Sequence, residues 1–344
     1  MDSITQAALG GAIGGAVLGR SFGRKAVLVG AMLGTVPDLD VVVDYGDPVA
    51  DMTRHRGFSH SLFILLPFSL VLAALLWRWR PAIPFRRWWA CTGLVLLTHP
   101  LLDSFTTYGT QIFWPWGEPV SIASLFIIDP AYTVPLLIGI GLFLWRPDRL
   151  RPVVASLVLS TAYIAWSVAA QQVITLRTLQ VLADNGLTDA PRLIQPMPLS
   201  TLLWRVTVVG EDRRLEMVTG LLDSEGPPQI ATYLRDPALA SSALATADGE
   251  RLHWFTDGVI DWSVDGDQLV ATDIRLGVPG HHPFAFTIAR RSDDGHWRAV
   301  RPIRRPEPAL RPDQLTSLVR RIGGDTGALC LAGQPAAVRN VEPC

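Results

Sequence analysis

Three short blocks of the sequence place histidine and aspartate side chains at the edges of apolar segments. The blocks read Val36-Pro-Asp-Leu-Asp40, His55-Arg-Gly-Phe-Ser-His60-Ser and His99-Pro-Leu-Leu-Asp103. Imidazole and carboxylate groups are the usual protein ligands of zinc-type ions, and an ionisable side chain beside an apolar span marks a functional site by default. Three of the seven histidines fall in these blocks. The sequence therefore predicts one divalent-metal site, with zinc as the expected ion.

The spacing of His99 and Asp103 suits a shared metal ion. Residues four apart lie on one face of a helix, one turn from each other. Pro100 removes a backbone donor, so we expect His99 to lie at a kink or at a helix end. A buried hydrogen-bonded pair without a metal is the alternative interpretation of this block.

His55 and His60 cannot both face one ion from a regular helix, because five residues correspond to about 140° around the helix axis. We expect a loop at His55, with Gly57 as a flexible turn, followed by a helix that begins at His60 and is capped by Ser59. Both imidazoles can then reach one ion. The alternative is a charged loop whose arginines extend toward lipid headgroups.

Further aspartates can bind the ion or act as a base. Asp38 and Asp40 follow Pro37, and in a turning segment we expect one of them to bind metal and the other to support a ligand or a second ion. Asp129 precedes Pro130, a pattern typical of a helix N-cap, with ligation or catalysis as the alternative. A carboxylate that does not bind the metal, Asp38 or Asp129, is the expected general base.

A polar, glycine-punctuated loop lies between Asp103 and Glu118. Such a loop can form the wall of a substrate site or an aromatic belt at a membrane interface, and both interpretations stay open for Trp114 and Trp116. We predict that five of its residues bind substrate: Tyr108, Gly109, Thr110, Gln111 and Glu118.

Composition divides the chain near residue 176. Residues 1 to 176 carry 22 charged side chains, whereas the 168 residues after them carry 39. The first part contains six apolar runs, at 4–19, 26–36, 61–77, 88–102, 130–145 and 152–174. A spanning helix needs about 20 apolar residues, so the third and sixth runs are long enough. The second is a half-helix, a re-entrant segment or a helix buried by its neighbours. A soluble helical core is the alternative.

The first apolar run contains five glycines, at positions 10, 11, 14, 15 and 19. They form a small-residue face suited to close helix packing in lipid. We expect this run to be a retained helix and not a secretory signal, because no positive region precedes it.

Basic residues predict the orientation of the apolar runs. Ten of the twelve lysines and arginines of the first part lie in three alternate connections, at 20–25, 78–87 and 146–151. The positive-inside rule assigns these connections to the cytoplasm. The predicted metal ligands and everything after the sixth run then face outward, so we expect a multi-pass bacterial inner-membrane protein with an extracytoplasmic C-terminal domain.

Several motifs together resemble those of the membrane-bound metal-dependent hydrolases of the YdjM type. The resemblance covers roughly residues 1 to 175 and rests on Met1-Asp-Ser-Ile-Thr5, Pro37-Asp-Leu-Asp40, the two histidine blocks, Tyr108-Gly-Thr-Gln111 and Phe126-Ile-Ile-Asp-Pro130. That family is grouped, on distant similarity, with zinc-dependent phospholipases C and nucleases, which hydrolyse phosphate esters.

The resemblance implies a helical fold and a specific set of ligands. Carried over by motif, the preferred metal ligands are Asp40, His60, His99 and Asp103, with Asp38 and His55 nearby. One departure stands out, because many relatives read Thr-His near the start, whereas this chain has Thr5-Gln6. Glutamine is a poor zinc ligand, which weakens the case for a second ion.

The residue pattern after the apolar runs predicts a soluble α+β domain with an antiparallel sheet at residues 177–305. A Pro/Arg-rich linker and tail is expected at 306–344. Strands are expected at 202–209, 214–222, 251–259, 268–274 and 284–289, with Asp-Gly turns and a helix at 237–246. We expect His281 and His282 to be exposed. Cys330 and Cys344 can pair if this part is exported.

Two function classes follow from these observations. The favoured class is a metal-dependent hydrolase of phosphate esters or lipid-linked substrates at the outer face of the inner membrane. The alternative is a non-catalytic membrane scaffold with a structural metal and an outer domain that binds a partner. A transporter is disfavoured because the polar residues gather at one face and not at the midplane. A net charge of −1 gives no argument for nucleic acid as a partner, whereas the apolar runs predict the lipid bilayer.

Overall fold

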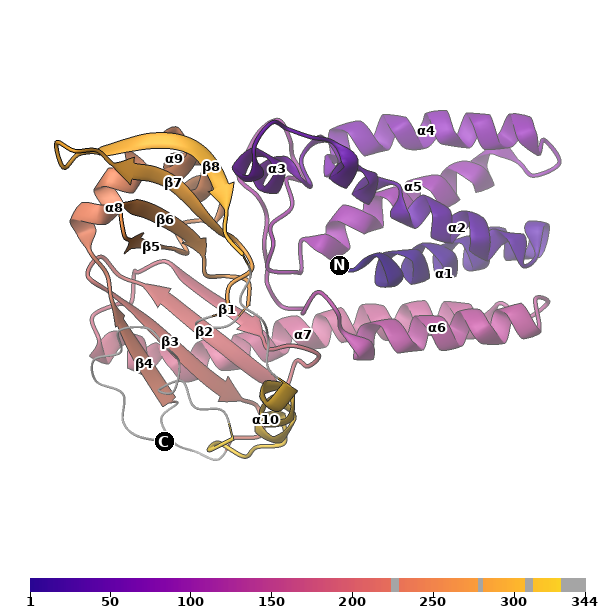
Figure 1. The fold of residues 1–344 in the computed structure, drawn as a ribbon. Helices are drawn as coiled ribbons and strands as arrows, with labels where there is room; N and C mark the ends of the chain where they lie inside the picture. Colours follow the sequence, from indigo (N-terminus) through magenta and orange to yellow (C-terminus); the bar gives the residue numbers. More distant parts are fainter. Residues whose placement is uncertain (224–228, 278–280, 307–311, 329–344) are drawn as a thin grey trace. The chain divides into compact units, whose positions relative to one another are not determined.

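The computed structural model describes residues 1–223, 229–277, 281–306 and 312–328, and its backbone divides into two compact units (Figure 1). The first unit comprises Met1–Val43, Arg54–Val168 and Pro198–Ser200. The second comprises Asp44–Thr53, Ala169–Met197 and the described residues from Thr201 onward. The division falls inside one long helix, after Val168, whereas composition changes near residue 176.

Helices form the first unit, and they coincide with the apolar runs. Short 3-10 turns, η1 (Pro37–Val42) and η2 (Phe58–His60), interrupt them where the histidine and aspartate blocks lie. Side-chain caps fix two of the helix starts, because Asp2 accepts from the Ile4 and Thr5 amides and Asp129 accepts from the Ala131 and Tyr132 amides. The helices are α1 (Ser3–Phe22), α2 (Lys25–Thr35), α4 (Leu62–Trp79), α5 (Phe85–Asp103), α6 (Pro130–Trp145) and α7 (Arg151–Asp184).

Glycines let α1 and α2 approach until their backbones touch. A Cβ added to Gly10 would lie 2.3 Å from the Gly30 carbonyl oxygen, and one added to Gly30 would lie 2.1 Å from the Gly10 carbonyl oxygen. Gly14 and Gly34 make similar contacts with the facing backbone. The predicted packing role of the glycine face is confirmed. Because η1 follows α2 directly, this contact also fixes where Asp38 and Asp40 begin.

Two helices of the described residues are long and apolar enough to cross a membrane, namely α4 and α7. Only 17% of the most apolar window of α4 and 28% of that of α7 is buried. The core helix of a soluble protein buries most of its apolar residues, whereas α4 exposes large side chains such as Phe63, Val71 and Leu75. α2 and α6 are apolar but shorter. This pattern of exposure favours lipid contact.

The described part of the second unit contains two four-stranded antiparallel sheets, where the sequence predicted one. Within each sheet the strands follow chain order, and the predicted turns at Asp265-Gly266 and Asp294-Gly295 join β5 to β6 and β7 to β8. The strands are β1 (Arg192–Pro196), β2 (Leu203–Val209), β3 (Arg213–Gly220), β4 (Gln229–Leu234), β5 (Ile260–Asp265), β6 (Gln268–Asp273), β7 (Ala285–Arg291) and β8 (Trp297–Arg304).

Short helices complete the second unit, and one of them corrects a prediction. The segment 251–259 does not form a strand, because α9 (Ala247–Phe255) occupies most of it. The Thr246 hydroxyl caps this helix by accepting from the Gly249 amide at 3.0 Å, and Leu252 and Phe255 are buried at helical spacing. The predicted helix at 237–246 is confirmed as α8 (Pro237–Leu244). A last helix, α10 (Pro312–Ile322), packs Leu318 on the first sheet.

A buried ionic network lies in the second unit. Arg205 donates two hydrogen bonds of 2.8 Å to Glu216, which also accepts from the Thr207 hydroxyl at 2.8 Å. Burial raises the pKa of the Glu216 carboxyl, but Arg205, Arg214 and the Thr207 hydroxyl together hold the pKa below its usual value. His282 is partly buried and bonds through Nδ1 to the Leu276 carbonyl, so the expected exposure of this residue is wrong. Cys330 and Cys344 lie outside the described residues.

The α1–α2 contact can be tested with a matched pair of glycine variants. We expect Gly30→Ala to lower the free energy of unfolding by about 1–3 kcal/mol or more, because its Cβ would overlap backbone atoms of α1. Gly141→Ala is the control, since a Cβ at this position of α6 would meet no atom within 4 Å. Thermal unfolding of the detergent-purified proteins measures the difference. Equal melting temperatures for the two variants would contradict the close approach.

Candidate metal centre

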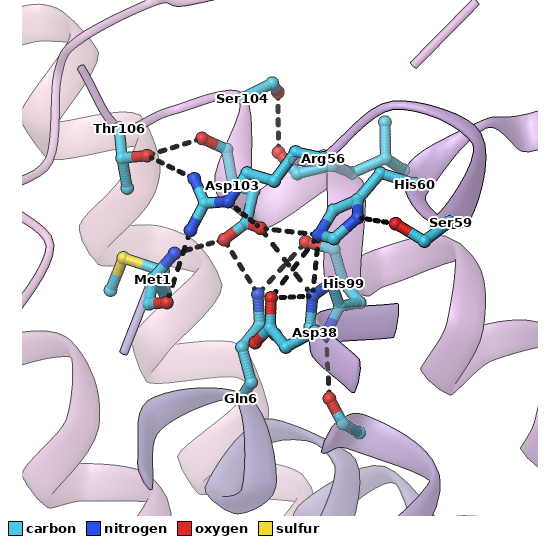
Figure 2. A network of polar contacts seen from close by, with 12 residues as sticks. Met1, Gln6, Asp38, Arg56, Ser59, His60, His99, Asp103, Ser104 and Thr106 are labelled. Atoms are coloured by element: carbon cyan, nitrogen blue, oxygen red, sulfur yellow. Dashed lines mark hydrogen bonds and ion pairs between the residues drawn. The ribbon is translucent and has the colours of Figure 1, made fainter. Parts of the chain in front are cut away.

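Four side chains that could hold a metal ion converge in the first unit (Figure 2). Asp38 comes from η1, His60 from η2, and His99 and Asp103 from the last turns of α5. One ligand atom of each residue lies within 4.8 Å of the others. His60, His99 and Asp103 are buried, whereas the Asp38 side chain is 19% exposed. Elements distant in sequence therefore supply one compact set of ligand atoms.

The distances within the group suit a tetrahedral ion. The His60 Nε2 atom lies 3.2 Å from His99 Nε2, 3.2 Å from Asp103 Oδ2 and 3.5 Å from Asp38 Oδ1. The His99 Nε2 atom lies 3.4 Å from Asp38 Oδ1 and 3.6 Å from Asp103 Oδ2. Ligands about 2.0–2.2 Å from a tetrahedral ion are about 3.3–3.6 Å from one another. These five distances are close to the edges of such a tetrahedron, and all four ligand atoms lie within 4.8 Å of one another.

Hydrogen bonds on the far side of each ring determine which nitrogen faces the group. His99 Nδ1 lies 2.7 Å from the Gly34 carbonyl oxygen, which only accepts, so Nδ1 carries the hydrogen. Ser59 donates its hydroxyl hydrogen to Asp40 at 2.7 Å and must therefore accept from His60 Nδ1 at 2.9 Å. In the neutral rings both Nε2 atoms then present lone pairs. Two lone pairs and two carboxylate oxygens meet, an arrangement that needs a cation or shared protons.

Protons and a metal ion would compete for these atoms. Burial lowers the pKa of His60, but Asp103 and Asp38 together raise it above its ordinary value. Burial raises the pKa of Asp38, but hydrogen bonds that the His60 and His99 rings donate when Nε2 is protonated hold it well below its usual range. Among the described residues Asp103 Oδ2 is buried and accepts no well-aligned hydrogen bond, although it pairs with the Arg56 guanidinium. These features fit a divalent cation, whose binding would displace protons from the imidazoles.

Positively charged and polar groups hold Asp103 in place (Figure 2). Gln6 Nε2 donates to Asp103 Oδ1 at 2.9 Å, the Met1 amino group contacts the same oxygen, and Arg56 Nε lies 3.2 Å from Oδ2. Gln6 therefore orients a carboxylate of the group, a role that suits an amide better than metal ligation does. The sequence blocks did not single out Met1 or Arg56, although Arg56 lies between the two histidines of its block.

Asp40 is not one of the four converging residues and instead connects the segments that carry them. Its Oδ1 lies 2.9 Å from His55 Nδ1, and its Oδ2 accepts from the Arg56 amide at 2.9 Å and from Ser59 at 2.7 Å. Burial raises the pKa of Asp40, but the hydrogen bond from His55 and the other donors lower it below its usual value. Asp40 and His55 thus form a separate hydrogen-bonded pair beside the group of four.

The backbone between His55 and Leu62 differs from the expected loop and capped helix. Arg56, not Gly57, has the left-handed conformation, with φ of +60°, and this aims its amide at Asp40 while its side chain reaches Asp103. Ser59 caps no helix, because its hydroxyl serves Asp40 and His60, and α4 begins only at Leu62. The hydrogen bonds of Ser59 to Asp40 and His60 therefore replace the expected helix cap.

α5 continues through Pro100 and ends at Asp103. His99 and Asp103 therefore lie on one helical face, with the 3.6 Å separation given above, and the helix ends one turn after His99. Proline removes only one donor, and the Ser104 and Phe105 amides still bond back to the last turn. The helix thus delivers two ligand atoms with a fixed spacing.

Part of the predicted substrate-binding loop contacts Arg56 and His55, which lie beside the four converging residues. Tyr108 packs against the Arg56 guanidinium, at 5.1 Å from the ring centre, and against the edge of the His55 ring. Thr110 is buried and bridges to Val120, whereas Glu118 is exposed. The Gln111 amide donates to the Arg56 carbonyl at 3.0 Å, and Gly109 turns the chain with φ of +97°.

Asp129 has its hydrogen bonds away from the group of four. Besides capping α6, it accepts from the Tyr163 hydroxyl at 3.1 Å, and its side chain is buried. Asp129 is not among the residues whose ligand atoms converge. Its observed contacts are those of a helix N-cap.

Comparisons with known proteins match part of this chain. The family model described as YdjM inner membrane protein matches residues 1–174. Inner membrane protein YbcI of Escherichia coli K12 is 32% identical over 139 residues, which are 37% of this chain and 80% of YbcI. The uncharacterised protein YfhP of Bacillus subtilis 168 is 30% identical over 120 residues, or 34% of this chain, and the match spans only 37% of YfhP. No solved structure matches significantly.

Metal analysis of purified variants tests the group of four. We expect about one equivalent of a divalent ion in the parent protein, and at least a tenfold loss of affinity in His99→Ala, because each ligand fixes the geometry of the site. His296→Ala is the control, since His296 is exposed in the second unit. Competition with a chromogenic chelator measures the affinity. Equal metal content in both variants would exclude His99 as a ligand.

Proposed function

The chain belongs to the YdjM inner membrane protein family, and we propose that its first unit is a membrane-bound, metal-dependent hydrolase. The observation that carries the proposal is the convergence of four possible ligand atoms within 4.8 Å of one another. In this proposal Asp38, His60, His99 and Asp103 bind a zinc-type ion. Asp40 and His55, expected as ligands from the motifs, serve the site through their mutual hydrogen bond.

The chemistry follows from the residues around that ion. A zinc-type ion lowers the pKa of water and polarises a phosphoryl oxygen, which suits the hydrolysis of phosphate esters. Gly34 and Ser59 hold the two imidazoles with their Nε2 atoms inward, and Gln6 and Arg56 hold Asp103. Asp38 is the one partly exposed member of the group, so substrate and water approach from its side.

Exposed aliphatic side chains beside the ligands favour a lipid-linked substrate. In η1, Asp38 and Asp40 contact the site, whereas Leu39, Val41 and Val42 are 60%, 72% and 81% exposed. We call these three residues the apolar lip. Aliphatic side chains at the rim of a polar site fit a substrate that carries its phosphate ester next to hydrocarbon chains.

The proposed location is the outer face of the bacterial inner membrane. Membership of an inner membrane protein family and the exposed apolar faces of α4 and α7 support residence in that membrane. The basic connections at 20–25, 78–87 and 146–151 support a multi-pass arrangement in which the ligand blocks and the second unit are extracytoplasmic.

A non-catalytic scaffold with a structural metal is the competing proposal, because four protein ligand atoms converge at the site. Structural zinc sites close their coordination with four protein ligands, whereas catalytic sites usually keep one position for water. Four protein atoms converge here, and the charges of Arg56 and the Met1 amino group also stabilise the carboxylate of Asp103. The two proposals differ in whether Asp38 leaves room for water.

A hydrolysis assay separates the two proposals. The zinc-loaded protein is expected to cleave bis-p-nitrophenyl phosphate or phospholipid vesicles, and His99→Ala and Asp103→Ala should reduce the rate to background because the ion is lost. Asp129→Asn should retain most of the activity, since an asparagine still caps α6. If the protein binds zinc stoichiometrically, hydrolyses no substrate and unfolds when the metal is chelated, the hydrolase proposal is wrong and the scaffold proposal holds.

The apolar lip predicts a difference between two substrates. In the double variant Val41→Ser/Val42→Ser we expect about a tenfold lower rate on phosphatidylglycerol vesicles, because two exposed valines contribute on the order of 1.4 kcal/mol of apolar contact. The rate on soluble bis-p-nitrophenyl phosphate should stay within about twofold. Val319→Ser, an exposed position of α10, is the control. Equal losses on both substrates would show that the lip does not contact lipid.

A further inference from the structure

We propose that His55, oriented by Asp40, is the proton acceptor for the water that attacks the substrate. This inference rests on the proposed hydrolase and assigns a role that neither the four converging residues nor the helix cap at Asp129 fills. It differs from the motif-based expectation, in which His55 binds metal and an aspartate is the base.

The hydrogen bond to Asp40 determines the tautomer of His55. Asp40 Oδ2 accepts from a backbone amide and from a hydroxyl, which stabilises the ionised carboxylate. An ionised carboxylate can only accept, so His55 Nδ1, at 2.9 Å from Oδ1, must carry the hydrogen. In the neutral ring Nε2 then presents a lone pair. Among the described residues no hydrogen bond to that nitrogen is found.

His55 lies beside the converging ligands but outside their group. Its ring centre is 6.2 Å from that of His60, in an edge-to-face arrangement, and Tyr108 packs against another edge at 5.6 Å. The His55 side chain is 24% exposed, whereas the Asp40 side chain beneath it is 1% exposed. A buried carboxylate therefore holds a solvent-accessible imidazole next to the site, the relation in which a carboxylate fixes the tautomer of a general base.

Asp40 positions the proposed base and a proposed ligand together. The same carboxylate bonds to His55 through Oδ1 and, through Ser59, to His60 Nδ1. The Arg56 amide completes its set of donors, which explains the left-handed backbone at Arg56. Displacement of Asp40 would therefore move both imidazoles, so the distance between base and ligand is fixed by one side chain.

The other carboxylates are engaged elsewhere. Asp38 directs Oδ1 toward both His60 and His99. Asp129 accepts two backbone amides of α6 and the Tyr163 hydroxyl. His55 is the histidine of the three sequence blocks whose second ring nitrogen stays outside the group of four.

Water gives one proton to His55 Nε2 while its oxygen bonds to the phosphorus atom of the ester. The bond between phosphorus and the leaving oxygen breaks, and that oxygen takes the proton from the imidazolium of His55. The products are a phosphate with one ester bond fewer and an alcohol, and His55 returns to its neutral state.

The experiment compares His55→Ala with His253→Ala, an exposed histidine of α9. For His55→Ala we expect kcat to fall about 10²–10⁴-fold with unchanged zinc content and KM, and added imidazole to restore part of the rate. His253→Ala should match the parent protein. Loss of zinc in His55→Ala would make His55 a ligand, and an unchanged kcat would remove it from the reaction; either result overturns the proposal.

A second measurement does not depend on activity. Nitrogen NMR of the zinc-loaded protein labelled in histidine should show neutral His55 with the hydrogen on Nδ1, and Asp40→Asn should abolish that preference. A hydrogen on Nε2 in the parent protein would contradict the proposed role. If the parent protein binds zinc and shows this tautomer but hydrolyses nothing, both the hydrolase proposal and the proposed role of His55 are wrong. If His55→Ala still hydrolyses the substrate at the parent rate, only the proposed role of His55 is wrong.

Discussion

The structure of the first unit depends on the close approach of two imidazole nitrogens and two carboxylate oxygens. When the imidazole rings are neutral, all four atoms can only accept hydrogen bonds. Two imidazole nitrogens 3.2 Å apart and two carboxylate oxygens repel one another unless a cation or protons lie between them. Much of the nearby structure resists that repulsion. Gly34 fixes His99, Ser59 fixes His60, and α5 carries His99 and Asp103 on one face. The close contact of α1 with α2 anchors the turn that brings in Asp38.

Two further carboxylate arrangements support these atoms in different ways. Asp103 contacts Gln6, Arg56 and the Met1 amino group, so donors and positive charge outside the group of four offset its charge. Asp40 accepts from neutral donors and from His55, and it lies outside the group. The groups around Asp103 offset the cost of burying its charge, whereas the hydrogen bonds of Asp40 fix the positions of two histidines. This division explains why two aspartates of one short motif, Asp38 and Asp40, differ in their surroundings.

Sequence patterns predicted the apolar helices and most of the strands, because hydrophobic periodicity depends on local burial. They also indicated that His60, His99 and Asp103 belong to one site. The residue pattern left Asp38 and Asp40 open and the resemblance favoured Asp40, whereas Asp38 belongs to the converging group. Both lie in one 3-10 turn, and only the path of that turn determines which oxygen reaches the imidazoles. The left-handed backbone at Arg56 and the helix at 247–255 were missed for similar reasons: a contact to Asp40 and a cap at Thr246 outweigh local preference.

The number of protein ligands bears on function more directly than their identity does. Four protein atoms complete a tetrahedron, and a hydrolase needs a place for water beside the ion. Asp38 differs from the other three because it is partly exposed and stands on a six-residue turn, whereas His99 and Asp103 are fixed by a helix and His60 by Ser59. If these residues hold an ion in a hydrolase, Asp38 is the residue beside which water would need room. That side carries the exposed aliphatic residues of η1, so access for water and access for a lipid-linked ester coincide.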